Sequence, residues 1–154
     1  MPEAGVIISD TSCLIVLRNI DELTLLQKVY SSIITTKEVA DEFGDEFPDW
    51  ILIKSPKDQQ KQQLLSFQVD KGEASAIALA MELPTEAIIL DDYKARQLAV
   101  KLGLPVTGTL GVLIKAKNQE IIPSVIPILE KLKQTNFRIS NQLVEEVLEM
   151  AGEK

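Results

Sequence analysis

The chain has 154 residues, 45% of them hydrophobic, and its 23 acidic and 16 basic residues give a net charge of −7. It contains no histidine, which excludes histidine-based acid–base chemistry, and one cysteine, Cys13, which excludes an internal disulfide and argues against a zinc site. A metal would have to be held by oxygen ligands, which favours Mg²⁺ or Mn²⁺. The acidic balance also argues against a simple basic nucleic-acid binder.

The length and composition are those of one globular domain, which we expect to span residues 1–154. No apolar run approaches the ~20 residues that cross a bilayer. The opening residues MPEAGVIISD lack the basic start and long apolar segment of a secretory signal. We therefore expect a cytoplasmic protein with no membrane partner.

Along the chain, short apolar runs alternate with helical patterns. We expect strands at 6–9, 32–35, 50–54, 87–91 and 105–107, because these runs lack the polar alternation of half-exposed strands. We expect helices after the first and second strands, from Asp21 to Tyr30, and at 73–83, 93–102, 110–118, 123–134 and 140–150. This alternation predicts an α/β fold with a parallel sheet and helices on both faces.

Three acids stand at the ends of predicted strands: Asp10 after the first, and Asp91 and Asp92 at the fourth. Ligands bind beyond the carboxyl ends of parallel strands, so these acids are expected at a ligand-binding edge. The triplet Asp10-Thr11-Ser12 lacks the second acid of haloacid-dehalogenase-type phosphatases, PVTGTLG lacks the lysine of receiver domains, and glycine-rich nucleotide loops are absent. A cluster of carboxylates that holds one or two divalent metals remains, to which Glu42 and Glu73 can contribute.

Five motifs in order resemble the segments of PIN-domain proteins over nearly the whole chain: ISDTSCLIVL, TTKEVADEF, GEASAIALA, ILDDYKARQLA and GLPVTGTLGVLIKAK. They look most like the small prokaryotic branch related to VapC-type toxin ribonucleases. The resemblance implies a three-layer sandwich with a parallel five-stranded sheet in the order 3-2-1-4-5. It also implies Mg²⁺- or Mn²⁺-dependent endonucleolytic cleavage of single-stranded RNA, often by a homodimer, with an antitoxin protein that blocks the site in the toxin members.

The resemblance also assigns residues to the site. The carboxylates that match the family's metal ligands are Asp10, Glu42, Glu73 and one of the pair Asp91 and Asp92. We expect catalysis from Asp10, Glu42, Glu73 and Asp92, the last preferred over Asp91 by register. Glu73 stands where many family members have aspartate. The supporting residues are Ser12, Thr109, which can donate a hydrogen bond into the site, and Arg96, which can pair with a site acid.

Each assignment has a purely structural alternative. Asp10 and one of the two acids at the fourth strand can cap helices, and Glu73 can complement a helix N-terminus. Glu42 can belong to a solvated acidic face, because residues 38–49 hold six acids and no base. Residues 93–119 hold five bases and no acid, from which we expect Lys94 and Lys101 to bind RNA. The competing functions are a non-catalytic interaction or nucleic-acid-binding module, and a phosphatase on the same metal site.

Overall fold

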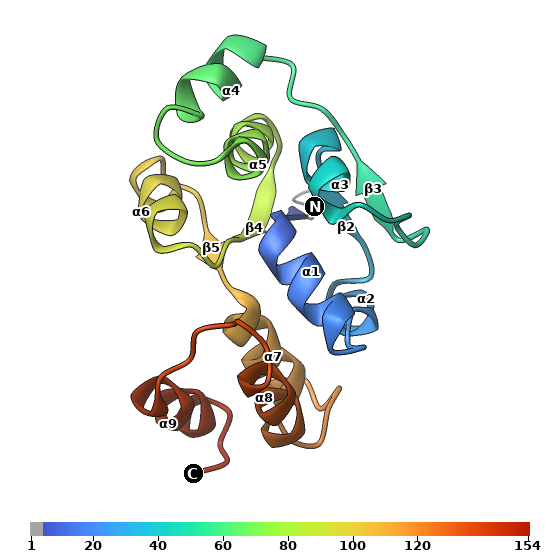
Figure 1. The fold of residues 1–154 in the computed structure, drawn as a ribbon, viewed down its shortest axis with the longest axis vertical. Coiled ribbons are helices and arrows are strands. Elements are labelled where there is room, and N and C mark those ends of the chain that lie inside the picture. Colours follow the sequence, from blue (N-terminus) through green and yellow to red (C-terminus); the bar gives the residue numbers. More distant parts are fainter. Residues whose placement is uncertain (1–4) are drawn as a thin grey trace.

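The computed structural model describes residues 5–154 and contains a parallel five-stranded sheet in the order β3-β2-β1-β4-β5 (Figure 1). The strands are β1 (Val6–Ser9), β2 (Ile33–Thr35), β3 (Ile51–Ile53), β4 (Thr85–Ile89) and β5 (Val106–Thr107). The helices are α1 (Thr11–Asn19), α2 (Thr24–Tyr30), α3 (Lys37–Phe43), α4 (Gln59–Leu65), α5 (Lys71–Glu82), α6 (Tyr93–Lys101), α7 (Thr109–Asn118), α8 (Ile126–Lys133) and α9 (Asn141–Met150). The expected α/β architecture and strand order are confirmed.

Two hydrophobic cores cover the two faces of the sheet, because successive residues of a strand point to opposite sides. In β1, Ile7 belongs to the core shared with α1, α2 and α7, whereas Ile8 belongs to the core shared with α5 and α6. Cys13 is buried in the first of these cores, as expected for a free cysteine. Helices α7, α8 and α9 lie together beyond one end of the sheet (Figure 1).

Several elements differ from the sequence-based expectation. Strand β4 ends at Ile89, two residues before the expected end at 91, and α8 begins at Ile126, three residues after the expected start at 123. Helix α2 begins at Thr24 and not at Asp21, because Asp21 adopts a φ of 58° in the turn that ends α1. Helix α4 has no apolar periodicity, since QQKQQLL carries apolar residues only at its end. Its start is marked instead by Asp58, whose side chain accepts the Lys61 N–H at 3.0 Å. Within residues 5–154, no helix is both long enough and apolar enough to span a bilayer.

Candidate functional site

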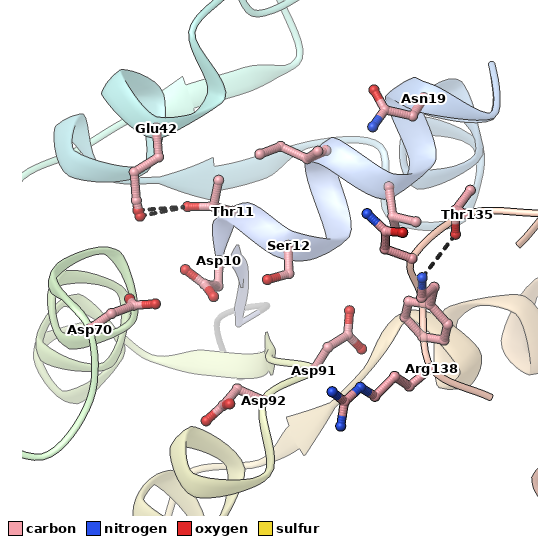
Figure 2. A pocket seen from close by; sticks show the side chains of 14 residues that line it. Asp10, Thr11, Ser12, Asn19, Glu42, Asp70, Asp91, Asp92, Thr135 and Arg138 are labelled. Carbon is pink, nitrogen blue, oxygen red and sulfur yellow. Dashed lines mark hydrogen bonds between the residues drawn. The ribbon is translucent and has the colours of Figure 1, made fainter. Parts of the chain in front are cut away.

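A pocket of about 700 Å³ opens at the carboxyl edge of the sheet, where β1 and β4 end (Figure 2). Five carboxylates from four parts of the chain line it: Asp10, Glu42, Asp70, Asp91 and Asp92. The end of β1 lies next to the end of β4 because the two strands are neighbours, with Ser9 opposite Ile89. Residues 135–138, between α8 and α9, line another side of the pocket.

Asp10 is the most deeply buried of these five acids, with 3% of its surface exposed. It stands at the N-terminus of α1, where its side chain makes no capping hydrogen bond. Among the described residues, its Oδ1 atom is buried and has no hydrogen-bond partner. Burial raises the pKa of Asp10 to about 8. The Thr11 N–H opposes this rise, whereas the charges of Glu73, Asp70 and Glu42 add to it.

Glu42 reaches the pocket from α3. The Thr36 hydroxyl caps this helix by accepting the Val39 N–H at 3.2 Å, and a buried 2.7 Å hydrogen bond joins Thr36 to Ser75 of α5. The Thr11 hydroxyl lies 3.3 and 3.4 Å from the two carboxylate oxygens of Glu42 and donates to them. Glu42 is therefore oriented by a hydroxyl, which leaves its negative charge in place.

The glycine of the GEASAIALA motif makes room for the Glu42 carboxylate. A Cβ atom on Gly72 would overlap both carboxylate oxygens of Glu42, with Oε2 only 2.5 Å away. Burial raises the pKa of Glu42, and the charge of Asp70 adds to the rise. The start of α5 thus determines where an acid of α3 can lie.

Asp70, which was not assigned from the sequence, lines the pocket, whereas Glu73 is not among the lining residues. The two form a capping box at the start of α5. Asp70 Oδ1 accepts the Glu73 N–H at 2.8 Å, and Glu73 Oε1 accepts the Asp70 N–H at 3.1 Å. Burial raises the pKa of Glu73 to about 7, against the lowering effect of the Asp70 N–H. The Asp-x-x-Glu spacing, which is typical of a capping box, is the feature of the sequence that could have identified Asp70 at the start of α5.

Asp91 and Asp92 have different partners. Asp91 accepts two hydrogen bonds from Thr109: the N–H lies 2.8 Å from Oδ1 and the hydroxyl 2.6 Å from Oδ2. Asp92 caps α6 by accepting the Ala95 N–H at 3.0 Å, and it also lines the pocket. The capping role that one of the two acids was expected to have therefore belongs to Asp92, and Thr109 acts on Asp91.

Arg96 makes no ion pair within 4 Å in the part of the chain that the structure describes, so the expected pairing with a site acid is wrong. Its Nη1 atom donates instead to the Leu90 carbonyl at 2.9 Å, which fixes the chain as it leaves β4. The guanidinium still lies beside the site. A Cβ atom on Gly108 would be 2.6 Å from Arg96 Nη1 and 2.8 Å from Asp91 Oδ1.

The other residues expected to support the site or bind RNA are Ser12, Lys94 and Lys101, and they lie in two different places. Ser12 is exposed and lines the acidic pocket. Lys94 and Lys101 are both exposed on α6, and neither lines that pocket. Lys101 instead lines a separate hollow between α6 and β5.

The acidic pocket has the chemistry of a site for a divalent cation. Its lining contains five carboxylates and one basic residue, Arg138. Within residues 5–154, no three acids are close enough together to form a ready-made metal cage. The unpartnered oxygen of Asp10 nevertheless lacks the positive charge or donor that a buried carboxylate needs, and oxygen ligands suit Mg²⁺ or Mn²⁺. The residues present therefore fit such an ion.

The burial of Asp10 leads us to expect that stability depends on pH when no metal is bound. Between pH 3.8 and about 8, the carboxyl ionises in the unfolded chain but stays protonated in the folded one. The free energy of unfolding must then fall as pH rises through this window, by an amount on the order of a few kcal/mol. Urea unfolding in EDTA at pH 5 and pH 8 measures this loss.

In the same experiment, Asp10→Asn should lose less free energy of unfolding than the wild type between pH 5 and pH 8 and should exceed it in stability at pH 8. The loss that remains comes from Glu73, whose pKa is also raised. Glu149→Gln, which removes an exposed acid from α9, should keep the wild-type dependence. Equal pH dependence in wild type and Asp10→Asn would contradict the burial effect.

A comparison with family models matches residues 6–153 to the DUF3368 family, which is described as a PIN domain. No curated protein matches the chain. The matched region contains every strand of the sheet and all five acids of the pocket. PIN domains are in general nucleases that use divalent metals. The chain belongs to the PIN-domain family.

Proposed function

We propose that this protein is a Mg²⁺- or Mn²⁺-dependent endoribonuclease that cleaves single-stranded RNA in the acidic pocket. The observation that carries the proposal is Asp10, a buried carboxylate with an unpartnered oxygen, surrounded by four other lining acids at the carboxyl edge. Such a cluster is unfavourable by itself, because like charges in a partly dehydrated site repel. A divalent cation removes this repulsion.

The ligands we propose are Asp10 with Glu42, Asp91 and Asp92, and we add Asp70, which lines the pocket in the place expected for Glu73. Glu73 then acts through Asp70, which it holds in the capping box. When bound, Mg²⁺ or Mn²⁺ supplies positive charge that stabilises the charge developing on a phosphodiester in the transition state.

The side chains around the ligands set their orientation. Thr109 holds Asp91 through its N–H and hydroxyl, and Thr11 holds Glu42 through its hydroxyl. These neutral donors do not compete with a cation for the carboxylate charge. The absence of histidine from the chain fits a reaction in which no histidine moves a proton.

Arg138 is the basic residue best placed to meet the RNA backbone in the pocket. Its side chain extends toward Asp91 from the segment between α8 and α9 (Figure 2). In that segment, the Phe137 N–H donates to the Thr135 hydroxyl at 3.0 Å and forms a turn. Within residues 5–154, Arg138 makes no ion pair within 4 Å, so its guanidinium is available for a phosphate.

A toxin role with an antitoxin partner remains part of this proposal and is supported by the resemblance to the VapC-related branch. A homodimer also remains part of this proposal. Its support is now the exposed apolar residues of the edge strand β3, Leu52 and Ile53, because α8 and α9 bury core residues within the chain itself.

The nuclease proposal predicts cleavage of a labelled single-stranded RNA with Mg²⁺ or Mn²⁺ but not with Ca²⁺, whose looser coordination positions the reacting groups poorly. Asp10→Asn should remove cleavage while circular dichroism and thermal unfolding show an intact fold. Gel analysis of the products measures this. Equal cleavage by wild type and Asp10→Asn would reveal a contaminating nuclease. A protein that binds RNA but cleaves none under any metal would support the non-catalytic module instead.

The contact between Gly72 and Glu42 gives a sharper test of the site. Gly72→Ala should change the free energy of unfolding by no more than ~1 kcal/mol, because alanine favours the helix and the Glu42 side chain can swing away. The displaced carboxylate should lower kcat by about 100-fold. Glu42→Ala and the double variant Glu42→Ala/Gly72→Ala should have equal activity, since the added methyl group no longer meets a carboxylate. A further loss in the double variant would contradict this account.

The proposed role of Arg138 predicts that Arg138→Ala weakens RNA binding about tenfold and lowers the slope of log affinity against log salt by about 1. Fluorescence anisotropy in Ca²⁺ buffer measures both quantities. Lys133→Ala removes an exposed base of α8 and serves as the charge-matched control, with affinity expected to be unchanged. If both substitutions weaken binding equally, the effect is one of net charge alone.

A further inference from the structure

A second hollow of about 400 Å³ lies between α6 and β5, the strand at the edge of the sheet. We call it the α6 groove, and its lining residues are Tyr93, Arg96, Gln97, Val100, Lys101 and Val106. Five of the six lie on one helix, and α6 and β5 lie next to each other in the fold (Figure 1).

The apolar part of the α6 groove is the exposed aromatic ring of Tyr93. Tyr93 is 72% exposed although it is a large hydrophobic residue, and Val100 is exposed on the same helix. The Gln97 side-chain N–H donates to the Tyr93 hydroxyl at 2.8 Å, four residues along α6. This hydrogen bond favours one orientation of the ring, which reduces the conformational entropy lost when a base stacks on it.

The charged part of the α6 groove favours an anion. Among the described residues, Arg96 and Lys101 line it and no acid does, although the whole chain has a net charge of −7. A ligand that brings both a flat apolar face and negative charge is complementary to this lining. Nucleotides of a single strand have this chemistry, because each carries a base with two open faces and a phosphate.

The α6 groove begins beside the acidic pocket. Tyr93 directly follows Asp92, which lines that pocket. Arg96 lines the groove, and its Nη1 atom and Asp91 Oδ1 both lie within 3 Å of the point where a Gly108 Cβ would stand. A strand with a phosphate among the acids can therefore place a nearby nucleotide against α6.

We propose that the α6 groove binds an unpaired base of the RNA strand close to the scissile phosphate, by stacking on Tyr93, with Lys101 contacting the backbone. This inference rests on the proposed nuclease function for the identity of the strand. It also gives a physical reason for selecting single strands, because a base within a duplex has both faces covered and cannot reach the ring.

The test is equilibrium binding of a fluorescein-labelled single-stranded RNA in Ca²⁺ buffer, which needs no cleavage. Tyr93→Ala should weaken binding about 5- to 100-fold, and Tyr93→Phe, which keeps the ring, should stay close to wild type. Phe67→Ala is the matched control, because Phe67 is 79% exposed and lies outside the α6 groove. Circular dichroism checks that each variant is folded.

Two further measurements separate stacking from a general surface effect. A series of RNAs, each with one abasic position, should contain one RNA that binds the wild type as weakly as the intact RNA binds Tyr93→Ala. The same abasic position should not weaken binding to Tyr93→Ala any further. A 2-aminopurine at this position should be quenched by the wild type and Tyr93→Phe but not by Tyr93→Ala. Binding of a blunt RNA duplex should not change with Tyr93→Ala.

The outcomes distinguish the two proposals. Equal affinity of wild type and Tyr93→Ala for the single strand would overturn the α6 groove and leave a measured metal-dependent cleavage intact. Tyr93-dependent binding without cleavage under any metal would overturn the nuclease function and keep the groove as a nucleic-acid site. The groove proposal would also be overturned if the protein bound no RNA. It would be overturned as well if Tyr93→Ala changed sedimentation and left RNA affinity unchanged, and the groove would then be a surface for protein contacts.

Discussion

The site depends on a carboxylate that is buried at the end of the central strand, with no counter-charge among residues 5–154. The backbone places Asp10 there, because β1 runs between β2 and β4 and the Asp10 N–H bonds to the Ile89 carbonyl at 3.1 Å. This backbone bond holds the Cα atom of Asp10 at the edge of the sheet. Burial disfavours its charged form, and the neighbouring acids do so as well. The fold thus maintains an electrostatic strain that the proposed cation would relieve, a pattern typical of functional sites.

Neutral hydroxyl groups hold the acids around Asp10. Thr11 orients Glu42, Thr109 orients Asp91, and the buried pair Thr36 and Ser75 ties the start of α3 to α5. A lysine or arginine in these places would orient a carboxylate equally well but would cancel its charge. Among the residues lining the pocket, the basic group is confined to Arg138, on a segment far along the chain from the acids.

Helix α6 connects the acid cluster to the surface around it. Its N-terminal cap is a pocket acid, Asp92, and its first residue is the exposed ring of Tyr93. Arg96, one turn later, fixes the exit of β4 by bonding the Leu90 carbonyl. One side of α6 therefore stabilises the fold next to the sheet. Its other side carries the aromatic and basic residues of the α6 groove. Capping and ligand binding are not exclusive at Asp92, because a carboxylate has several lone pairs to share.

The sequence by itself determined the α/β class, the positions of the strands and the acids at their ends, because buried parallel strands are continuous apolar runs and polar groups follow where they stop. The motifs in order added the strand order and the family. Only the tertiary structure decided that Asp70 and not Glu73 lines the pocket, that Gly72 makes room for Glu42, and that Arg138 joins the site. Local spacing cannot decide these points, because each depends on how a side chain on one element meets another element distant in the chain.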